Sequence, residues 1–180
     1  HEIVGVVEEK GEDIDCDIRG NQISVGDRIT WTEFIYCGNC FYCKVVNTPQ
    51  KCVNVKKYGH ENSDIAPHLT GGFAEYCYVL PISGVIRIPD SLTDTEAAPI
   101  MCGVPTMVSA VNSVGVGPND SVVVQGLGLM GLYALALSKS KGAKKIIGID
   151  SMPDRLKLAK QFGADEVVNI SDMNESDLIS

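Results

Sequence analysis

A glycine-rich turn between a strand-like run and a helix-like run constrains this chain most strongly. Residues 122–131 read VVVQGLGLMG, and an alanine- and leucine-rich run continues from Leu132 to Ser140. A second β-like run, Lys145–Ile149, ends at Asp150, 19 positions after Gly131. A strand, a G-x-G-x-x-G turn, a helix and an acid about 20 residues further on are typical of a dinucleotide-binding βαβ unit.

Each glycine of this turn has a separate physical role in such a unit. Gly126 permits the tight turn, Gly128 lets the backbone approach a pyrophosphate, and Gly131 lets the helix pack closely on the strand. The first helical residues, Leu129 and Met130, belong to a helix N-terminus whose free N–H groups attract the anion. We therefore expect these five residues to bind a nucleotide.

Asp150 indicates which nucleotide. A carboxylate at the end of the second strand would accept hydrogen bonds from the ribose hydroxyls and repel a 2′-phosphate, which favours NAD over NADP. The alternative is a glycine-rich loop in a parallel sheet that binds no nucleotide.

The pattern around the turn predicts β-α-β-α-β, with a second helix starting at Pro153 and a third strand at Glu166–Ile170. We expect right-handed crossovers and a parallel sheet. The residues expected to face inward are Leu129, Leu132, Tyr133, Ala136 and Leu137 on the first helix, and Leu158, Ala159 and Phe162 on the second.

The region before the turn reads as a small β-rich domain. Strands are expected at residues 1–7, 28–31, 71–79 and 85–88, and a helical stretch at Asp94–Ala98 is interrupted by Pro99. We place the domains at residues 1–112 and 113–180.

Four of the seven cysteines fall within sixteen residues, as Cys37, Cys40, Cys43 and Cys52. Four thiolates at this spacing can surround one tetrahedral zinc ion, and a complete ligand shell makes such a zinc structural. Disulfides or buried free cysteines are the alternative. Clustered thiols without the even spacing of a secreted scaffold favour metal binding and a cytoplasmic location.

Charge and hydropathy narrow the range of partners. The net charge of −8 argues against nucleic acid, whose phosphates need clustered Lys and Arg. No apolar run approaches the ~20 residues of a membrane span. The chain opens on His1 and not on Met, so we expect it to be a piece of a longer protein.

Taken together, these residues resemble the zinc-dependent medium-chain alcohol dehydrogenases. The resemblance covers essentially the whole chain. It rests on His1-Glu2 followed by Gly5, the Gly26-Asp27-Arg28 turn, the four-cysteine lobe, Gly72–Tyr76, Cys102-Gly103 and the G-x-G-x-x-G turn with Asp150. It implies a GroES-like β-rich domain followed by an α/β Rossmann-type parallel sheet, of which only the first βαβαβ half is present.

The resemblance also implies site residues. His1 and Cys102 match two of the three protein ligands of a catalytic zinc, and Glu2 matches the acid beside it. Arg155 matches a basic residue near the adenosine ribose, and Thr106 falls near the nicotinamide. From the residues alone, a His and a Cys a hundred positions apart would not be assigned to one site.

Three departures from the family pattern stand out. The family's first catalytic cysteine would lie upstream of His1, the sheet has three of six expected strands, and eight residues instead of seven separate Cys43 from Cys52. Because two protein ligands hold zinc poorly, we expect the isolated piece to bind the structural zinc but to turn over little or no alcohol.

His60 and His68 lack a partner at metal-ligand spacing, so we interpret both as loop residues. Separately, Lys57–His60 and Pro49–Cys52 resemble a phosphonate-associated subgroup of the family.

The leading hypothesis is therefore a homo-oligomeric oxidoreductase that moves a hydride between an alcohol or polyol and NAD, with zinc polarising the alcohol oxygen. A non-catalytic nucleotide- and zinc-binding protein on the same scaffold is the alternative. A zinc-free reductase is disfavoured by Cys102 and the four-cysteine lobe.

Overall fold

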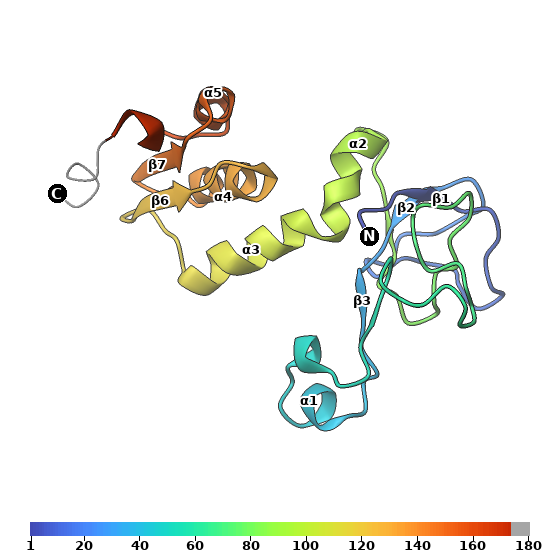
Figure 1. Cartoon of the computed structure of the whole chain (residues 1–180). Coiled ribbons are helices and arrows are strands. Elements are labelled where there is room, and N and C mark those ends of the chain that lie inside the picture. Colours follow the sequence, from blue (N-terminus) through green and yellow to red (C-terminus); the bar gives the residue numbers. More distant parts are fainter. Residues whose placement is uncertain (174–180) are drawn as a thin grey trace. The chain divides into compact units, whose positions relative to one another are not determined.

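The computed structural model describes residues 1–173 of the 180-residue chain and contains two compact units, His1–Cys102 and Gly103–Ser180 (Figure 1). The domain boundary expected at residue 112 falls within helix α3 (Gly103–Val114) and stays a prediction.

A small antiparallel sheet organises the first unit. Its strands are β1 (Gly5–Val6), β2 (Arg28–Thr30) and β5 (Ile86–Arg87), in the order β1-β2-β5. They occupy three of the four expected positions but are shorter than expected. Residues 71–79 form no strand, so that prediction was wrong. Gly72 lies so close to Ile3 that a Cβ there would be 2.8 Å from its Cγ1. Residues 72–76 are exposed, and only Cys77 and Val79 of this segment pack against the core.

The core of this unit gathers around Trp31 and Tyr58, which are almost fully buried and meet edge to face at 5.7 Å. The Tyr58 hydroxyl lies 2.6 Å from Ser83 Oγ and accepts a hydrogen bond from the Leu80 N–H at 2.7 Å. A buried phenol needs such partners. These two contacts attach Tyr58 to residues 80 and 83, more than twenty positions further along the chain.

A second antiparallel pair supports the cysteine lobe. Strand β3 (Phe34–Ile35) pairs with β4 (Lys56–Lys57), and the chain between them forms α1 (Phe41–Lys44) and the 3₁₀ turn η1 (Pro49–Lys51). Figure 1 shows this lobe extending from the end of β3. The ladder therefore holds the two ends of the lobe together.

The first unit ends in two short helical segments. Helix α2 (Asp94–Ala97) starts at a capping box in which Thr93 and Glu96 satisfy each other's backbone N–H groups. The 3₁₀ segment η2 (Ala98–Met101) follows at the position where Pro99 was expected to interrupt the helix.

The second unit confirms the β-α-β-α-β prediction. After α3 come β6 (Ser121–Gln125), α4 (Leu129–Ser140), β7 (Lys145–Asp150), α5 (Pro153–Gln161), β8 (Glu166–Asn169) and the 3₁₀ turn η3 (Ile170–Asp172). The strands are parallel in the order β6-β7-β8. Leu127, Leu135 and Ile146 are fully buried in its core.

The expected inward faces of α4 and α5 were partly wrong. Leu135 is the most buried apolar residue of α4, whereas Leu129 is 49% exposed. On α5, Leu156 and Ala159 are buried and Leu158 is 38% exposed. The apolar residues of α4 surround the helix, so its sequence does not predict which face turns towards the sheet. The close contact of Gly131 with Gly126 and Val124 in the first turn helps to fix that face.

Within residues 1–173, no single helix combines the length and apolar character of a membrane span. The neighbouring segments Asp94–Met101 and Gly103–Val114 reach that threshold only when counted together as a broken span.

The tight contact at Gly131 gives a first prediction. A Cβ there would overlap the carbonyl oxygen of Gly126 and lie 3.5 Å from Val124 Cγ1. Gly131→Ala gains up to about 1 kcal/mol of helix propensity, but overpacking costs about 1–3 kcal/mol. Because the obstacle is backbone, we expect net destabilisation, measured as faster amide hydrogen exchange in β6 and α4.

The matched control is Gly128→Ala. Gly128 has φ −72°, and a Cβ there meets nothing within 4 Å. Its exchange pattern should stay much closer to the wild type than that of Gly131→Ala, because only the N-cap preference for Gly over Ala is lost. Wild-type protection in Gly131→Ala would contradict the close-packing argument.

Candidate active site

The four lobe cysteines meet the geometric requirement of one zinc ion. Their sulfurs lie within 4.8 Å of one another, with Cys40–Cys43 at 3.4 Å, Cys37–Cys52 at 3.6 Å and Cys40–Cys52 at 3.9 Å. A tetrahedral zinc with Zn–S bonds of about 2.3 Å needs sulfurs about 3.8 Å apart. All seven cysteines lie in the described part of the chain, and none is in a disulfide. The observed spacing therefore fits the zinc interpretation.

Local backbone groups already distinguish these thiols. Backbone hydrogen bonds, foremost from Asn39, lower the pKa of Cys37 to about 6. Desolvation and the neighbouring Cys40 thiol raise the pKa of Cys43 to about 12. Four such sulfurs can be ionised together only with a cation among them.

A second group of donor side chains is built on the β3–β4 ladder. Residues 31–36 alternate between buried and exposed, which places Glu33 in the inward register between Trp31 and Ile35 with 6% of its surface exposed. The Glu33 carbonyl accepts a hydrogen bond from Tyr58 N at 3.1 Å, one step beyond the Phe34–Lys57 pair.

The turn after β4 brings His60 to the same place. Gly59 adopts φ +76° and donates its N–H to the Thr70 carbonyl at 2.6 Å. His60 Nε2 then lies 3.2 Å from His1 Nδ1 and 3.8 Å from Glu33 Oε1. The donor atoms of His1, Glu33 and His60 all lie within 4.8 Å of one another.

Cys102 joins this group directly after η2. Its thiol is hydrogen-bonded to Glu33, and burial, that bond and the negative charges of Glu33 and Glu2 raise its pKa to about 11. The fold thus brings His1 and Glu2 into the neighbourhood of Cys102, a hundred positions along the chain. Sequence spacing alone could not show this.

Sequence reasoning missed Glu33 and His60. His60 read as a loop residue because its partners are distant in the sequence and not at a metal-ligand spacing. One usable signal existed for Glu33: an acid occupies an inward position in the alternating run Trp31–Tyr36, where an apolar residue is expected.

The glycine turn of the second unit has the geometry of a nucleotide-binding loop. Gly126 adopts φ +88°, which lets β6 turn sharply into α4. The space around Gly128 is open to a ligand, since an added Cβ would meet nothing within 4 Å. Helix α4 starts at Leu129, and its first N–H groups have no partner within the helix. These features suit an anionic ligand.

Asp150 is buried at the end of β7 and held by backbone donors. Leu127 N donates to Oδ2 at 2.7 Å, and Ser151 N and Met152 N donate to Oδ1 at 2.8 and 2.9 Å. These bonds, the Leu127 one foremost, lower the pKa of Asp150. They occupy most of the roughly four acceptor positions of a carboxylate, so a ribose hydroxyl would use what remains.

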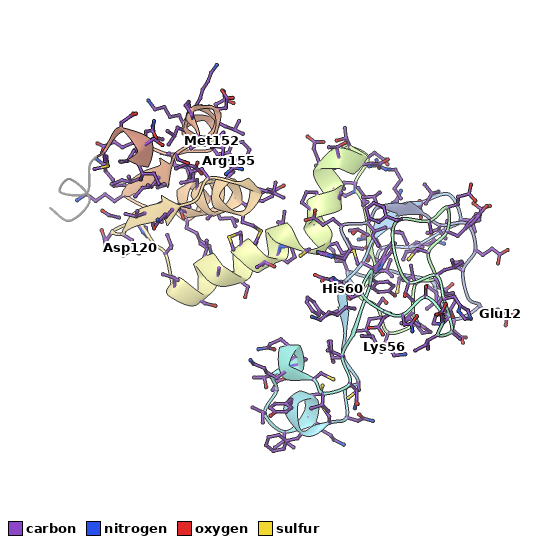
Figure 2. The ribbon with its side chains drawn as sticks, viewed as in Figure 1. Glu12, Lys56, His60, Asp120, Met152 and Arg155 are labelled. Carbon is purple, nitrogen blue, oxygen red and sulfur yellow. The ribbon has the colours of Figure 1, made fainter. Side chains whose placement is uncertain are left out.

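Two other predicted coenzyme residues belong to the same unit. Arg155 lies on α5 with Nη1 3.7 Å from Asp150 Oδ2, and Figure 2 shows it beside Met152 at the start of that helix. Thr106 lies in the first turn of α3 and is exposed.

The cysteine lobe gives a prediction about metal content. We expect Cys43→Ser to lose the tightly held zinc and the ordered lobe, because three sulfurs remain in a four-ligand site. Cys16→Ser is the control, since Cys16 is exposed outside the lobe. Zinc per chain after chelator dialysis is the measurement; equal zinc in the two variants would rule out a four-cysteine site.

Asp150 gives a prediction about pH. Because its folded-state pKa is depressed, its contribution to stability is present above the unfolded value of about 4 and is lost as the pH falls through the folded value. Wild type should therefore exceed Asp150→Asn in urea midpoint at pH 6, and the difference should shrink towards pH 2.5. Asp90→Asn, at an exposed carboxylate, is the control; a pH-independent difference would show that the charge is not responsible.

Comparisons with known proteins identify the family of this chain. The family model "Alcohol dehydrogenase GroES-like domain" matches residues 1–90, and "Zinc-binding dehydrogenase" matches residues 130–179. An alcohol dehydrogenase of Geobacillus stearothermophilus is 36% identical over 171 residues, which cover 94% of this chain and 46% of the relative. The chain spans about half the length of the curated relatives it matches.

Solved structures of dehydrogenases also resemble this chain over most of its length. An alcohol dehydrogenase from Thermotoga maritima superposes with a TM-score of 0.91 at 32% identity, covering 99% of this chain and 49% of that one. A zinc-binding dehydrogenase from Sinorhizobium meliloti bound to NADP gives a TM-score of 0.80 at 28% identity, with 97% and 46% covered. With the GroES-like family model spanning half of its residues, the chain belongs to the zinc-dependent medium-chain alcohol dehydrogenase family.

Proposed function

We propose that this chain carries the zinc ligands and the first part of the coenzyme-binding sheet of an NAD-dependent dehydrogenase acting on alcohols or polyols. The observation that carries the proposal is a chain of contacts. The Cys102 thiol is hydrogen-bonded to Glu33, and the Glu33 carboxylate lies within 4.8 Å of the donor nitrogens of His1 and His60. Packing alone does not bring an imidazole, a buried carboxylate and a thiol into contact, because burying such polar groups is unfavourable.

The donors present suit zinc. Imidazole nitrogen, thiolate sulfur and carboxylate oxygen are its usual protein ligands, and a site with an open position is catalytic. When bound, zinc supplies Lewis-acid polarisation of the alcohol oxygen, and NAD accepts the hydride.

The chain's own residues orient these groups. The β3–β4 ladder fixes Glu33, the η2 segment positions Cys102, and Gly59 permits the turn that places His60. Glu2 and Glu33 add negative charge beside the thiol. A cation placed among these groups would be held by charge as well as by coordination.

The preference for NAD is supported by the Asp150 carboxylate. A buried, ionised acid at the end of β7 repels a 2′-phosphate, and Arg155 at 3.7 Å is partly neutralised by it. The Sinorhizobium meliloti relative binds NADP, so the coenzyme is a property to be measured for this chain.

The alternative is a protein that binds zinc and nucleotide without catalysis. It would keep the cysteine lobe and the glycine turn but would not depend on Cys102. The cytoplasmic location, the homo-oligomeric state and the phosphonate-associated subgroup stay predictions.

An activity assay tests the proposal in a protein of family length that contains this chain. We expect alcohol-dependent reduction of NAD, with kcat/KM at least about tenfold higher than with NADP, corresponding to about 1.4 kcal/mol. Cys102→Ser should lower kcat by at least about 10³-fold, because it removes a ligand of the proposed catalytic metal.

The control for this assay is Cys77→Ser, which changes a half-buried thiol outside the donor group. It should keep activity within a few-fold of wild type. NAD and zinc binding without turnover of any primary, secondary or polyhydric alcohol would favour the non-catalytic alternative.

A further inference from the structure

Glu33 lies outside the motifs that relate this chain to its family, and His60 enters only through the Lys57–His60 resemblance to a subgroup, which gives it no role. Both side chains nevertheless lie beside His1. We propose that Glu33 and His60 are direct donors to the divalent metal ion at His1, giving this chain a site of two imidazoles and a carboxylate next to Cys102. The inference rests on the proposed function in taking His1 as a ligand; with Cys102 also bound, the alcohol oxygen would take a fifth position.

Distances between the donors support it. Ligand atoms 2.0–2.2 Å from a tetrahedral ion are about 3.3–3.6 Å apart. The observed separations are 3.2 Å between His1 Nδ1 and His60 Nε2 and 3.8 Å between His60 Nε2 and Glu33 Oε1. All three donor atoms lie within 4.8 Å of one another, so small side-chain rotations would place them around one ion.

The burial of Glu33 is hard to explain without a cation. Its side chain is 7% exposed, and a buried carboxylate needs compensating charge or strong hydrogen bonds. The Cys102 thiol is a weak donor, and His60 at 3.8 Å is beyond hydrogen-bond range and compensates the charge only when its ring is protonated.

A hydrogen bond between the two imidazoles is the simpler explanation of their contact. It would account for the 3.2 Å distance but not for the carboxylate beside them. Nor would it require Glu33 in an inward strand position between Trp31 and Ile35. A metal ion accounts for all three side chains together.

The positions of the donors are fixed by backbone structure on both sides. Glu33 precedes β3 and is tied through its carbonyl to Tyr58, while His60 N donates to the Lys57 carbonyl at 3.2 Å at the end of β4. A Cβ on Gly59 would lie 3.2 Å from His1 N, a tight contact, and the φ of +76° at this position also favours glycine. The group is therefore pre-organised by the β3–β4 ladder, as a metal site requires.

Metal titration of the 180-residue chain tests this inference. The cysteine lobe is first filled with one equivalent of Zn²⁺, and Co²⁺ is then titrated while its visible absorption and the heat of binding are followed. We expect one further Co²⁺ per chain, and Glu33→Gln and His60→Gln should each weaken its binding at least about tenfold.

The matched controls are His68→Gln and Glu75→Gln. His68 lies in the same loop region with Nδ1 2.9 Å from the Ser63 carbonyl, and Glu75 is exposed. Both should bind Co²⁺ like the wild type. Because His60 is half exposed, its variant should fold normally, and Glu33→Asp, which keeps the carboxylate, should retain part of the affinity.

A ¹⁵N spectrum of the imidazoles separates direct ligation from a positioning role. On adding Zn²⁺, one ring nitrogen of His60 should shift to the range of a metal-bound nitrogen, while the His68 resonances stay unchanged. Binding of the second metal that survives Glu33→Gln and His60→Gln but is lost in Cys102→Ser would overturn the inference and leave the proposed function standing. The absence of any second metal would also overturn it, and the NAD-reduction assay decides the proposed function independently.

Discussion

Thiols and carboxylates lie close together at two places in the first unit. When such groups are ionised, they repel one another strongly away from water. In the lobe, four sulfurs approach to 3.4–3.9 Å. Beside His1, a buried carboxylate meets the Cys102 thiol. A divalent cation among either group would favour the ionised thiols and offset the repulsion that their charges would otherwise cause. The ladders that hold the two clusters are short, so bound metals would add to the stability of this unit.

The two clusters share one structural support. The β3–β4 ladder closes the cysteine lobe at one end and carries Glu33 and the His60 turn at the other. On the proposed function, zinc bound in the lobe would also order the strands that carry Glu33 and His60. A structural metal would in this way support a catalytic one without contacting it.

Much of the second unit was predictable because its signals are local. A strand, three glycines and an acid within thirty residues determine the turn at Gly126, the start of α4 and the position of Asp150. The rotation of α4 was not predictable, because its apolar residues surround the helix. In the first unit, the cysteine spacing predicted the lobe, but Glu33 and His60 meet only through strand pairing between distant segments. Residues 71–79 have β-forming side chains but form no strand, and Gly72 packs closely on Ile3.

Anomalous diffraction at the zinc edge from crystals of the zinc-saturated chain tests the central claim most directly. Two peaks are expected. One should lie among the sulfurs of Cys37, Cys40, Cys43 and Cys52, and the other should lie within bonding distance of His1, Glu33 and His60. A single peak in the lobe, with Glu33 and His60 in contact only with each other, would contradict the account.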